Sequence, residues 1–180
     1  MKDEAPPEGM VYKDMNRKQR LYFMEHVVEV GALLHDAGFD DELVAVGLLH
    51  DSVERGTLAA DELRAGMGTA ICSLVLTLSE DSRIAAFDWR KAGLRRQVEN
   101  AGGLAVTVYA ADKLSDIRGL RRGIEIYGEA LDGRLGTHVG SMVAHYRESV
   151  EMVESMRPGS VFVPSLRLEL EALEGEVGRR

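Results

Sequence analysis

Residues 104–120 of this chain read LAVTVYAADKLSDIRGL, and the secondary structure of this stretch decides the fold class. The run Val-Thr-Val-Tyr at residues 106–109 favours a strand by its intrinsic propensity. Residues 112–120, which follow, have apolar positions at a spacing that is typical of a helix. We interpret the whole stretch as one buried helix, and this interpretation makes the chain all-α.

The rest of the sequence supports an all-α fold, because helix-breaking residues are few. The four prolines lie at positions 6, 7, 158 and 164, so helices can run through residues 8–157 without meeting one. Gly38 is expected to end a helix, Asp40 to cap the next one, and Gly47 to let another helix pack closely. Further helices are predicted over residues 14–36, 43–53, 57–67, 69–78, 85–100 and 136–156, and from a cap at Ser165 onward.

The length and composition predict a single domain. Of the 180 residues, 45% are hydrophobic and 29% are charged, as in globular proteins. Thirty acidic residues against 22 basic ones give a net charge of −8, which argues against polymeric nucleic acid as a partner. We predict a mobile tail at residues 1–11, a domain at residues 12–157, and a linker with an amphipathic helix at residues 158–180. The apolar stripe of that helix could dock on its own domain or on a second subunit, so oligomerisation stays open.

The sequence also predicts a soluble protein in the cytoplasm. Its single cysteine, Cys72, excludes an internal disulfide, fits a reducing compartment and is expected to be a small buried hydrophobic residue. The first eight residues lack the apolar segment of a signal peptide. No run approaches the roughly 18 apolar residues of a membrane span, so no membrane contact is expected.

Two of the five histidines stand in His-Asp pairs that differ in context. His35-Asp36 closes a predicted helix, where an exposed pair is expected. His50 and Asp51 instead follow the apolar run at residues 43–49, where burying either group without a partner would be costly. Glu54 lies on the same side of the predicted helix. A divalent metal would satisfy these imidazole and carboxylate groups.

Such a metal normally has four ligands, so two more must come from elsewhere in the chain. His26, on the preceding predicted helix, is one candidate. Asp112, which follows the apolar stretch at residues 106–111, is the other. Each alone is a weak indication, because an aspartate after an apolar run is often a helix cap. The four residues in this order indicate a metal site.

Three segments together resemble a known family. They are HVVEV from His26, VAVGLLHDSVE up to Glu54, and ADKLSDIR up to Arg118. They resemble the HD-domain phosphohydrolases, and are most similar to the (p)ppGpp hydrolase branch of the SpoT/Rel proteins and the small stand-alone alarmone hydrolases. The resemblance covers residues 17–120 and implies an all-α, HD-domain helical bundle.

The resemblance implies an enzyme, a guanosine 3′,5′-bis(diphosphate) 3′-pyrophosphohydrolase that depends on one divalent metal, commonly Mn²⁺ in that branch. It implies that Glu54 orients or deprotonates the attacking water. Arg17 and Lys18 would contact the guanine nucleotide, and Lys91 would bind its phosphates; solvated helix faces are the alternative for these three. The implied metal ligands are His26, His50, Asp51 and Asp112.

Three departures from the family pattern bear on catalysis and substrate. Arg55 follows Glu54 where the family has an aspartate implicated in the chemistry, so we count Arg55 with Glu54 as a candidate catalytic residue. Asp116 replaces a family asparagine beside the substrate, and we expect it to pair with Arg55 across the site. Residues 20–23 read RLYF where the family has Gly-x-Pro-Tyr, in the loop that shapes the base pocket.

Three functions stay open on this evidence. The first is hydrolysis of ppGpp, and the second is hydrolysis of another nucleotide, such as a nucleoside monophosphate or NADPH. The third is a catalytically degenerate HD module that binds a nucleotide without turnover, which Arg55 favours. The remaining polar candidates lie on periodic helices and are predicted to be core or surface residues rather than ligands: Tyr127, His138, His145 and Tyr146.

Overall fold

The computed structural model describes residues 5–7 and 9–179, and every regular element within them is helical, which confirms the all-α fold class. Within these residues, no helix combines the length and the apolar character needed to cross a membrane. The helices are η1 (Tyr12–Asp14), α1 (Arg17–Asp36), α2 (Asp41–Leu49), α3 (Ala60–Leu78), α4 (Phe87–Ala101), α5 (Gly103–Tyr127), η2 (Gly128–Leu131), α6 (Asp132–Leu135), α7 (Val139–Met156) and α8 (Val163–Val177).

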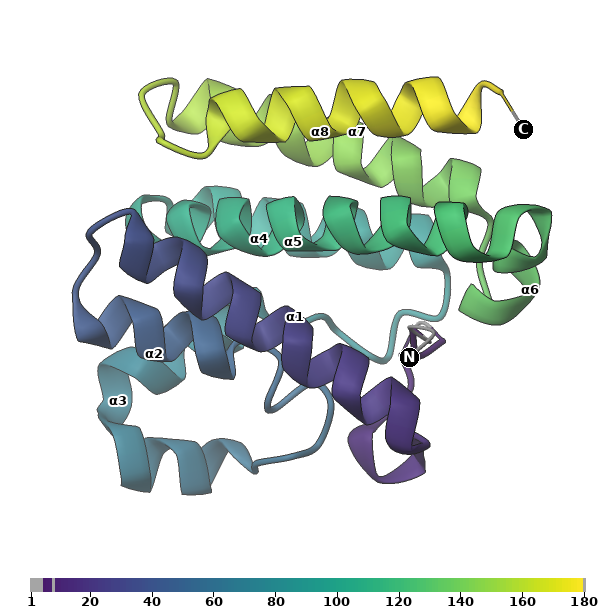
Figure 1. The fold of residues 1–180 in the computed structure, drawn as a ribbon. Coiled ribbons are helices and arrows are strands. Elements are labelled where there is room, and N and C mark those ends of the chain that lie inside the picture. Colours follow the sequence, from purple (N-terminus) through teal and green to yellow (C-terminus); the bar gives the residue numbers. More distant parts are fainter. Residues whose placement is uncertain (1–4, 8, 180) are drawn as a thin grey trace.

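Helix α5 is the central element of the bundle. It contacts α1, α2, α3, α4, α7 and α8. Figure 1 shows α7 and α8 on one side of α4 and α5, and α1, α2 and α3 on the other. Residues 105–115 of α5 are all buried, so packing on every side stabilises a helix here. This packing outweighs the strand propensity of residues 106–109.

Side-chain caps define the start of α1 and of α2. α1 begins at Arg17 rather than at the predicted residue 14, because Asn16 Oδ1 accepts hydrogen bonds from backbone N–H groups of its first turn. α1 ends before Gly38, and Asp40 Oδ1 accepts a hydrogen bond from the first turn of α2. The predicted roles of Gly38 and Asp40 are therefore confirmed.

Other helix boundaries follow from local backbone geometry. α3 bends at Gly68, whose φ of 86° is left-handed, as the predicted break between two short helices requires. α7 begins at Val139 rather than at residue 136, because His138 has an extended backbone. α8 includes Pro164 in its first turn, where proline is well tolerated. The predicted cap at Ser165 is therefore wrong.

Helices α1 and α2 approach closely where both carry glycine. A Cβ atom added at Gly47 would lie 2.6 Å from Leu34 Cδ1, and one added at Gly31 would lie 2.7 Å from Leu48 Cδ2. The close packing predicted at Gly47 is confirmed. This contact fixes the packing of α1 on α2 next to His50, the residue that follows the end of α2.

The apolar stripe of α8 docks on its own domain. Leu166, Leu170 and Leu173 are buried and belong to the main hydrophobic core. Cys72 is also buried in this core, as expected. Ala5, from the predicted tail, packs against the same core, while residues 1–4 and 8 of that tail lie outside the described residues. The division of the chain at residues 11 and 157 stays a prediction.

Candidate metal centre and active-site pocket

Three helices bring two histidines and an aspartate together. His26 lies on α1, His50 directly follows α2, and Asp112 lies on α5. His26 Nε2 and His50 Nε2 lie 3.2 Å apart, and Asp112 Oδ1 lies 3.3 Å from the first and 3.5 Å from the second. Asp51 Oδ1 lies 3.6 Å from His50 Nε2. The structure therefore brings His26, His50 and Asp112 together, with Asp51 beside His50.

A tight turn, rather than a continued helix, carries Asp51 and Glu54. α2 ends at Leu49, so the predicted helix up to residue 53 is four residues too long. The chain turns because the carbonyl of Ser52 accepts hydrogen bonds from both the backbone N–H and the hydroxyl of Thr57. These bonds replace the helical pattern and leave both carboxylates in the wall of a pocket.

Hydrogen bonds on the far edge of each ring define the histidine tautomers. His50 Nδ1 lies 2.7 Å from the carbonyl of Gly47, which can only accept, so this nitrogen carries the proton. The Ser115 hydroxyl donates to Glu29 at 2.9 Å and therefore accepts from His26 Nδ1 at 3.0 Å. Each ring thus turns its Nε2 atom toward the other ring and toward Asp112, and each Nε2 must be free of a proton to bind a metal.

This donor set fits a divalent cation. Metal–ligand bonds of about 2.1 Å separate neighbouring ligands by about 3.0 Å in octahedral and about 3.4 Å in tetrahedral geometry. Of the three separations among His26, His50 and Asp112, two lie in this range at 3.2 and 3.3 Å, and the third, 3.5 Å, lies just above it. Imidazole nitrogens and carboxylate oxygens are ligands of Mn²⁺, Zn²⁺ and Fe²⁺ alike, so the donor set does not select among these metals.

The charges around the cluster also favour a cation. Burial lowers the pKa of His50, but Asp51 and Asp112 outweigh it and raise this pKa to about 10. Burial raises the pKa of Asp51, but His50 and Arg55 outweigh it and lower this pKa to about 2. The pKa of Asp112 lies well below its usual value, because Lys113 and His50 outweigh the effect of burial. Two ionised carboxylates thus face the imidazoles.

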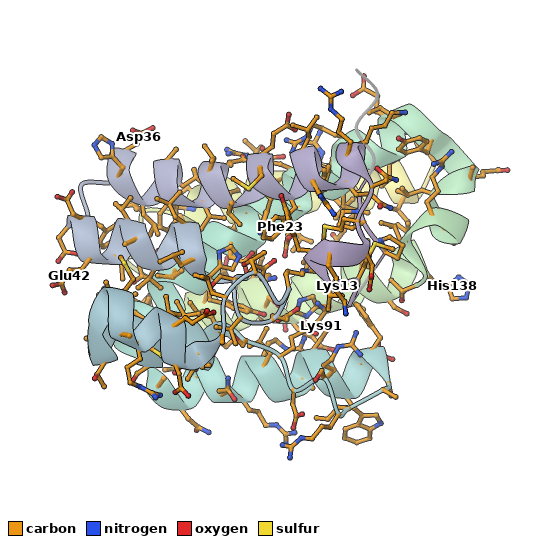
Figure 2. The ribbon with its side chains drawn as sticks, turned by 90° about the horizontal axis from the view of Figure 1, so that it is seen from below. Lys13, Phe23, Asp36, Glu42, Lys91 and His138 are labelled. Atoms are coloured by element: carbon orange, nitrogen blue, oxygen red, sulfur yellow. The ribbon has the colours of Figure 1, made fainter. Side chains whose placement is uncertain are left out.

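One pocket gathers most of the predicted site residues. Figure 2 shows Lys91 reaching from α4 toward the interior of the molecule, and His138 at the outer edge. Arg17 and Lys18 are exposed at the start of α1 and do not line the pocket, so the structure does not bring them to the other site residues. The predicted residues that do line it are His26, Asp51, Glu54, Arg55, Lys91, Asp112 and Asp116.

Glu54 is a carboxyl group with a pKa near neutrality. Its Oε2 accepts a hydrogen bond of 2.9 Å from the backbone N–H of Glu80. Burial, together with the charges of Asp51 and Glu80, raises the pKa of Glu54 to about 7. A carboxyl group with such a pKa can both accept and release a proton at neutral pH.

The expected pair between Arg55 and Asp116 is not formed. Arg55 Nε lies 3.4 Å from Asp51 Oδ2, and its guanidinium also donates to the carbonyl of Met10. Asp116 instead pairs with Lys113. The i,i+4 spacing places Arg55 beside Asp51. Lys113, which lies on α5 together with Asp116, neutralises Asp116. Arg55 and Asp116 therefore each have another partner.

Lys113 and Glu80 are site residues that the sequence analysis missed. Lys113 has a side chain only 5% exposed, and its Nζ lies 3.0 Å from Asp112 Oδ2. Burial lowers its pKa, but Asp112 and Asp116 raise this pKa well above the usual value. Glu80 pairs with Lys91 and Arg90. A lysine inside an apolar run signals a buried partner, whereas nothing in the local sequence signals Glu80.

We expect Ser115→Ala to weaken Mn²⁺ binding roughly 10- to 100-fold, because the change frees His26 to rotate and to shift its proton. Ser115 is 1% exposed, so water does not readily replace the lost hydroxyl. Calorimetric titration of the metal-free protein measures the effect. Ser73→Ala, at an exposed serine on α3, is the matched control. Unchanged affinity in Ser115→Ala would show that the hydroxyl does not position His26.

We expect Glu54→Gln to stabilise the metal-free protein at pH 8 but not at pH 4. The folded state raises the pKa of Glu54 from 4.5 to about 7, so folding favours its protonated form. The free energy of unfolding of the wild type therefore falls by roughly 1–3 kcal/mol as the pH rises from 4.5 to 7. Glutamine does not ionise, so the variant does not lose this stability. Urea unfolding at both pH values tests this, with exposed Glu171→Gln as the control. Equal stability of Glu54→Gln and wild type at pH 8 would contradict the expected penalty.

The chain is similar to known proteins in both sequence and structure. A probable guanosine-3′,5′-bis(diphosphate) 3′-pyrophosphohydrolase of Synechocystis is 34% identical over 65 residues, which are 36% of this chain and 9% of that protein. The human guanosine-3′,5′-bis(diphosphate) 3′-pyrophosphohydrolase MESH1 is 29% identical over 102 residues, which are 56% of each chain. The chain thus spans about half or less of the length of these relatives.

Two solved structures have the same fold. The crystal structure of lmo0812 from Listeria monocytogenes gives a TM-score of 0.71 at 22% identity, covering 82% of this chain and 92% of that one. The structure of a metazoan SpoT orthologue, described as hydrolysing ppGpp, gives 0.65 at 19% identity, covering 87% and 82%. A family model described as HD domain matches residues 10–125, a span that includes every ligand candidate of the metal centre. The chain therefore belongs to the HD domain family.

Proposed function

We propose that the chain is a metal-dependent phosphohydrolase that removes pyrophosphate from the 3′ position of ppGpp. The observation that carries this proposal is the convergence of His26 Nε2, His50 Nε2 and Asp112 Oδ1, which lie 3.2–3.5 Å from one another. The names of the human and Synechocystis relatives support the substrate. A nucleotide substrate and a cytoplasmic location are parts of this proposal.

The proposed metal is a single divalent ion, with Mn²⁺ as our first choice, held by His26, His50, Asp51 and Asp112. Such an ion lowers the pKa of water and neutralises charge on phosphoryl oxygens. Glu54 is the proposed proton acceptor, because its carboxyl group lies in the same wall and titrates near pH 7. Its hydrogen bond from the Glu80 backbone holds one of its two oxygens in place.

Basic side chains of the pocket are the proposed phosphate ligands. Lys91, Lys113 and Arg55 line the same pocket as Glu54. Each is paired with a carboxylate of the wall, so each is held in place before substrate arrives. Arg17 and Lys18 remain proposed contacts to the nucleoside, although they do not line this pocket. Asp116 is proposed to orient Lys113, with which it pairs.

A substrate panel tests the proposed reaction. Purified protein with Mn²⁺ is incubated with ppGpp, with a nucleoside monophosphate and with NADPH, and products are separated by anion-exchange chromatography. We expect GDP and pyrophosphate in equal amounts from ppGpp, and no product from the other two. Inorganic phosphate from the nucleoside monophosphate or from NADPH, without cleavage of ppGpp, would assign a different substrate.

Binding without turnover is the second candidate function, and Arg55 is the observation that favours it. Its guanidinium lies against Asp51, one of the four proposed ligands, at the position where the family pattern of the sequence resemblance has an aspartate. If this candidate is correct, the protein binds Mn²⁺ and ppGpp in calorimetric titrations but yields no product from any member of the panel.

A further inference from the structure

His145 is a buried histidine of α7 in the wall of the active-site pocket. It is 5% exposed and lines the pocket together with Phe87, Lys91 and Tyr146. Its ring centroid lies 6.2 Å from that of Phe87 and 5.3 Å from that of Tyr146, so two aromatic side chains hold the ring. It belongs neither to the metal-ligand cluster nor to the residues that the proposed reaction uses.

The tautomer of His145 is defined by its neighbour on α4. Arg95 Nη1 lies 2.6 Å from His145 Nδ1, and a guanidinium can only donate a hydrogen bond. Nδ1 is therefore an acceptor, and the proton of the neutral ring resides on Nε2. Glu148 binds the other side of the Arg95 guanidinium and keeps it in place.

The Nε2–H group of His145 has no hydrogen-bond partner within the described part of the chain, although it is buried. A buried donor of this kind costs free energy until an acceptor reaches it. Arg95, Glu148 and His145 line an outer hollow between α4 and α7. His145 also lines the active-site pocket with Phe87 and Tyr146, and Nε2 is the ring nitrogen that Arg95 does not bind.

The charges near His145 indicate the kind of acceptor. Burial and the cations Lys113, Lys91 and Arg95 hold the pKa of His145 well below its usual value, so the ring is a neutral donor at physiological pH. Lys91 and Lys113 line the pocket with it. An N–H donor beside two ammonium groups suits an anionic oxygen, and on the substrate proposed above this is a phosphate oxygen.

We propose that His145 is a substrate-binding residue whose Nε2–H donates a hydrogen bond to a phosphate oxygen of the nucleotide away from the metal centre. A substrate with two diphosphates can place one at the metal ligands and the other at His145, whereas a nucleotide with one phosphate cannot. This inference rests on the proposed function for the identity of the substrate. The buried, unpaired donor itself does not depend on that identity.

The first experiment needs no turnover. Protein labelled with ¹⁵N in its histidine rings is studied by NMR, with His145 assigned by the signals that vanish in His145→Phe, and with inorganic pyrophosphate and Mg²⁺ as the probe. We expect a neutral ring with the proton on Nε2, and a shift of this Nε2–H signal on addition of pyrophosphate. A proton on Nδ1, or a signal that does not move while those of His26 and His50 do, would overturn the proposal.

The second experiment measures ppGpp hydrolysis. Loss of a hydrogen bond to a charged group is expected to raise KM for ppGpp about 10- to 100-fold in His145→Phe, with little change in kcat. His145→Gln, which retains an N–H donor, should recover part of the affinity. Ser149→Ala is the matched control, because Ser149 is buried one turn further along α7 and its hydroxyl contacts the carbonyl and Nδ1 of His145 but not Nε2.

The two experiments distinguish an error in the proposed role of His145 from an error in the proposed function. An unchanged KM in His145→Phe, or no recovery in His145→Gln, would overturn the role of His145 while leaving the hydrolase intact. If the protein does not hydrolyse ppGpp at all, the proposed function fails, and the pyrophosphate-dependent NMR shift still decides whether His145 binds a phosphate oxygen.

Discussion

Asp112→Ala is expected to lower Mn²⁺ affinity by more than about 100-fold and to remove hydrolysis, because it deletes a carboxylate that lies beside both histidines. The oxygen that is lost lies 3.3 Å from His26 Nε2 and 3.5 Å from His50 Nε2. Without it, the two imidazoles and the carboxylate of Asp51 remain. Calorimetric titration with Mn²⁺, followed by metal analysis of the dialysed protein, measures this loss.

Asp112→Asn is the matched variant, because it keeps the shape of the side chain and removes only its charge. We expect intermediate affinity, since an amide oxygen is a weaker ligand than a carboxylate. Circular dichroism of both variants shows whether the helices are retained. Wild-type Mn²⁺ affinity in a folded Asp112→Ala protein would place the metal elsewhere.

Lys113→Met is expected to destabilise the metal-free protein by about 3–5 kcal/mol, because it leaves two carboxylates beside the pocket without their buried cation. Lys113 pairs with both Asp112 and Asp116. For a chain of this size the loss corresponds to a fall in Tm of roughly 6–20 °C. Saturating Mn²⁺ should reduce the loss, since a bound cation neutralises Asp112 in place of the lysine.

Two further variants make this prediction specific. Lys13→Met is the same substitution at an exposed lysine and should change Tm little. The double variant Lys113→Met with Asp116→Asn removes one of the two orphaned charges, so it should unfold at a higher temperature than Lys113→Met alone. A single variant as stable as wild type would show that Lys113 does not neutralise these carboxylates.

The helical fold could be predicted from sequence because the relevant signals are local. The absence of proline from residues 8–157 and the caps at Gly38 and Asp40 are properties of short segments, and the structure confirms them. The helix boundaries that were predicted wrongly depend on which of several neighbouring residues caps or ends the helix. Ser165 is a good cap by residue type, yet Pro164 already fits the first turn of α8. The end of α2 depends on hydrogen bonds from Thr57, which local periodicity does not reveal.

Some features of the candidate site could likewise be predicted from the sequence, and others could not. His26, His50 and Asp112 could be singled out because polar groups beside apolar runs need partners, and the structure places them together. The expected pair of Arg55 with Asp116 is wrong because each has a partner nearer in sequence, Asp51 for Arg55 and Lys113 for Asp116. His145 looked like an ordinary core residue in the sequence. Its unpaired Nε2–H follows from Arg95, 50 residues earlier, which only the packing of α4 on α7 brings into contact.

The central claim is tested most directly by pyrophosphate release from ppGpp in the presence of Mn²⁺, with wild type and Asp112→Ala measured side by side. The account predicts turnover by wild type, with one pyrophosphate for each GDP, and none by the variant. Equal release by both proteins, or no release by a wild-type protein that has bound Mn²⁺, would contradict it.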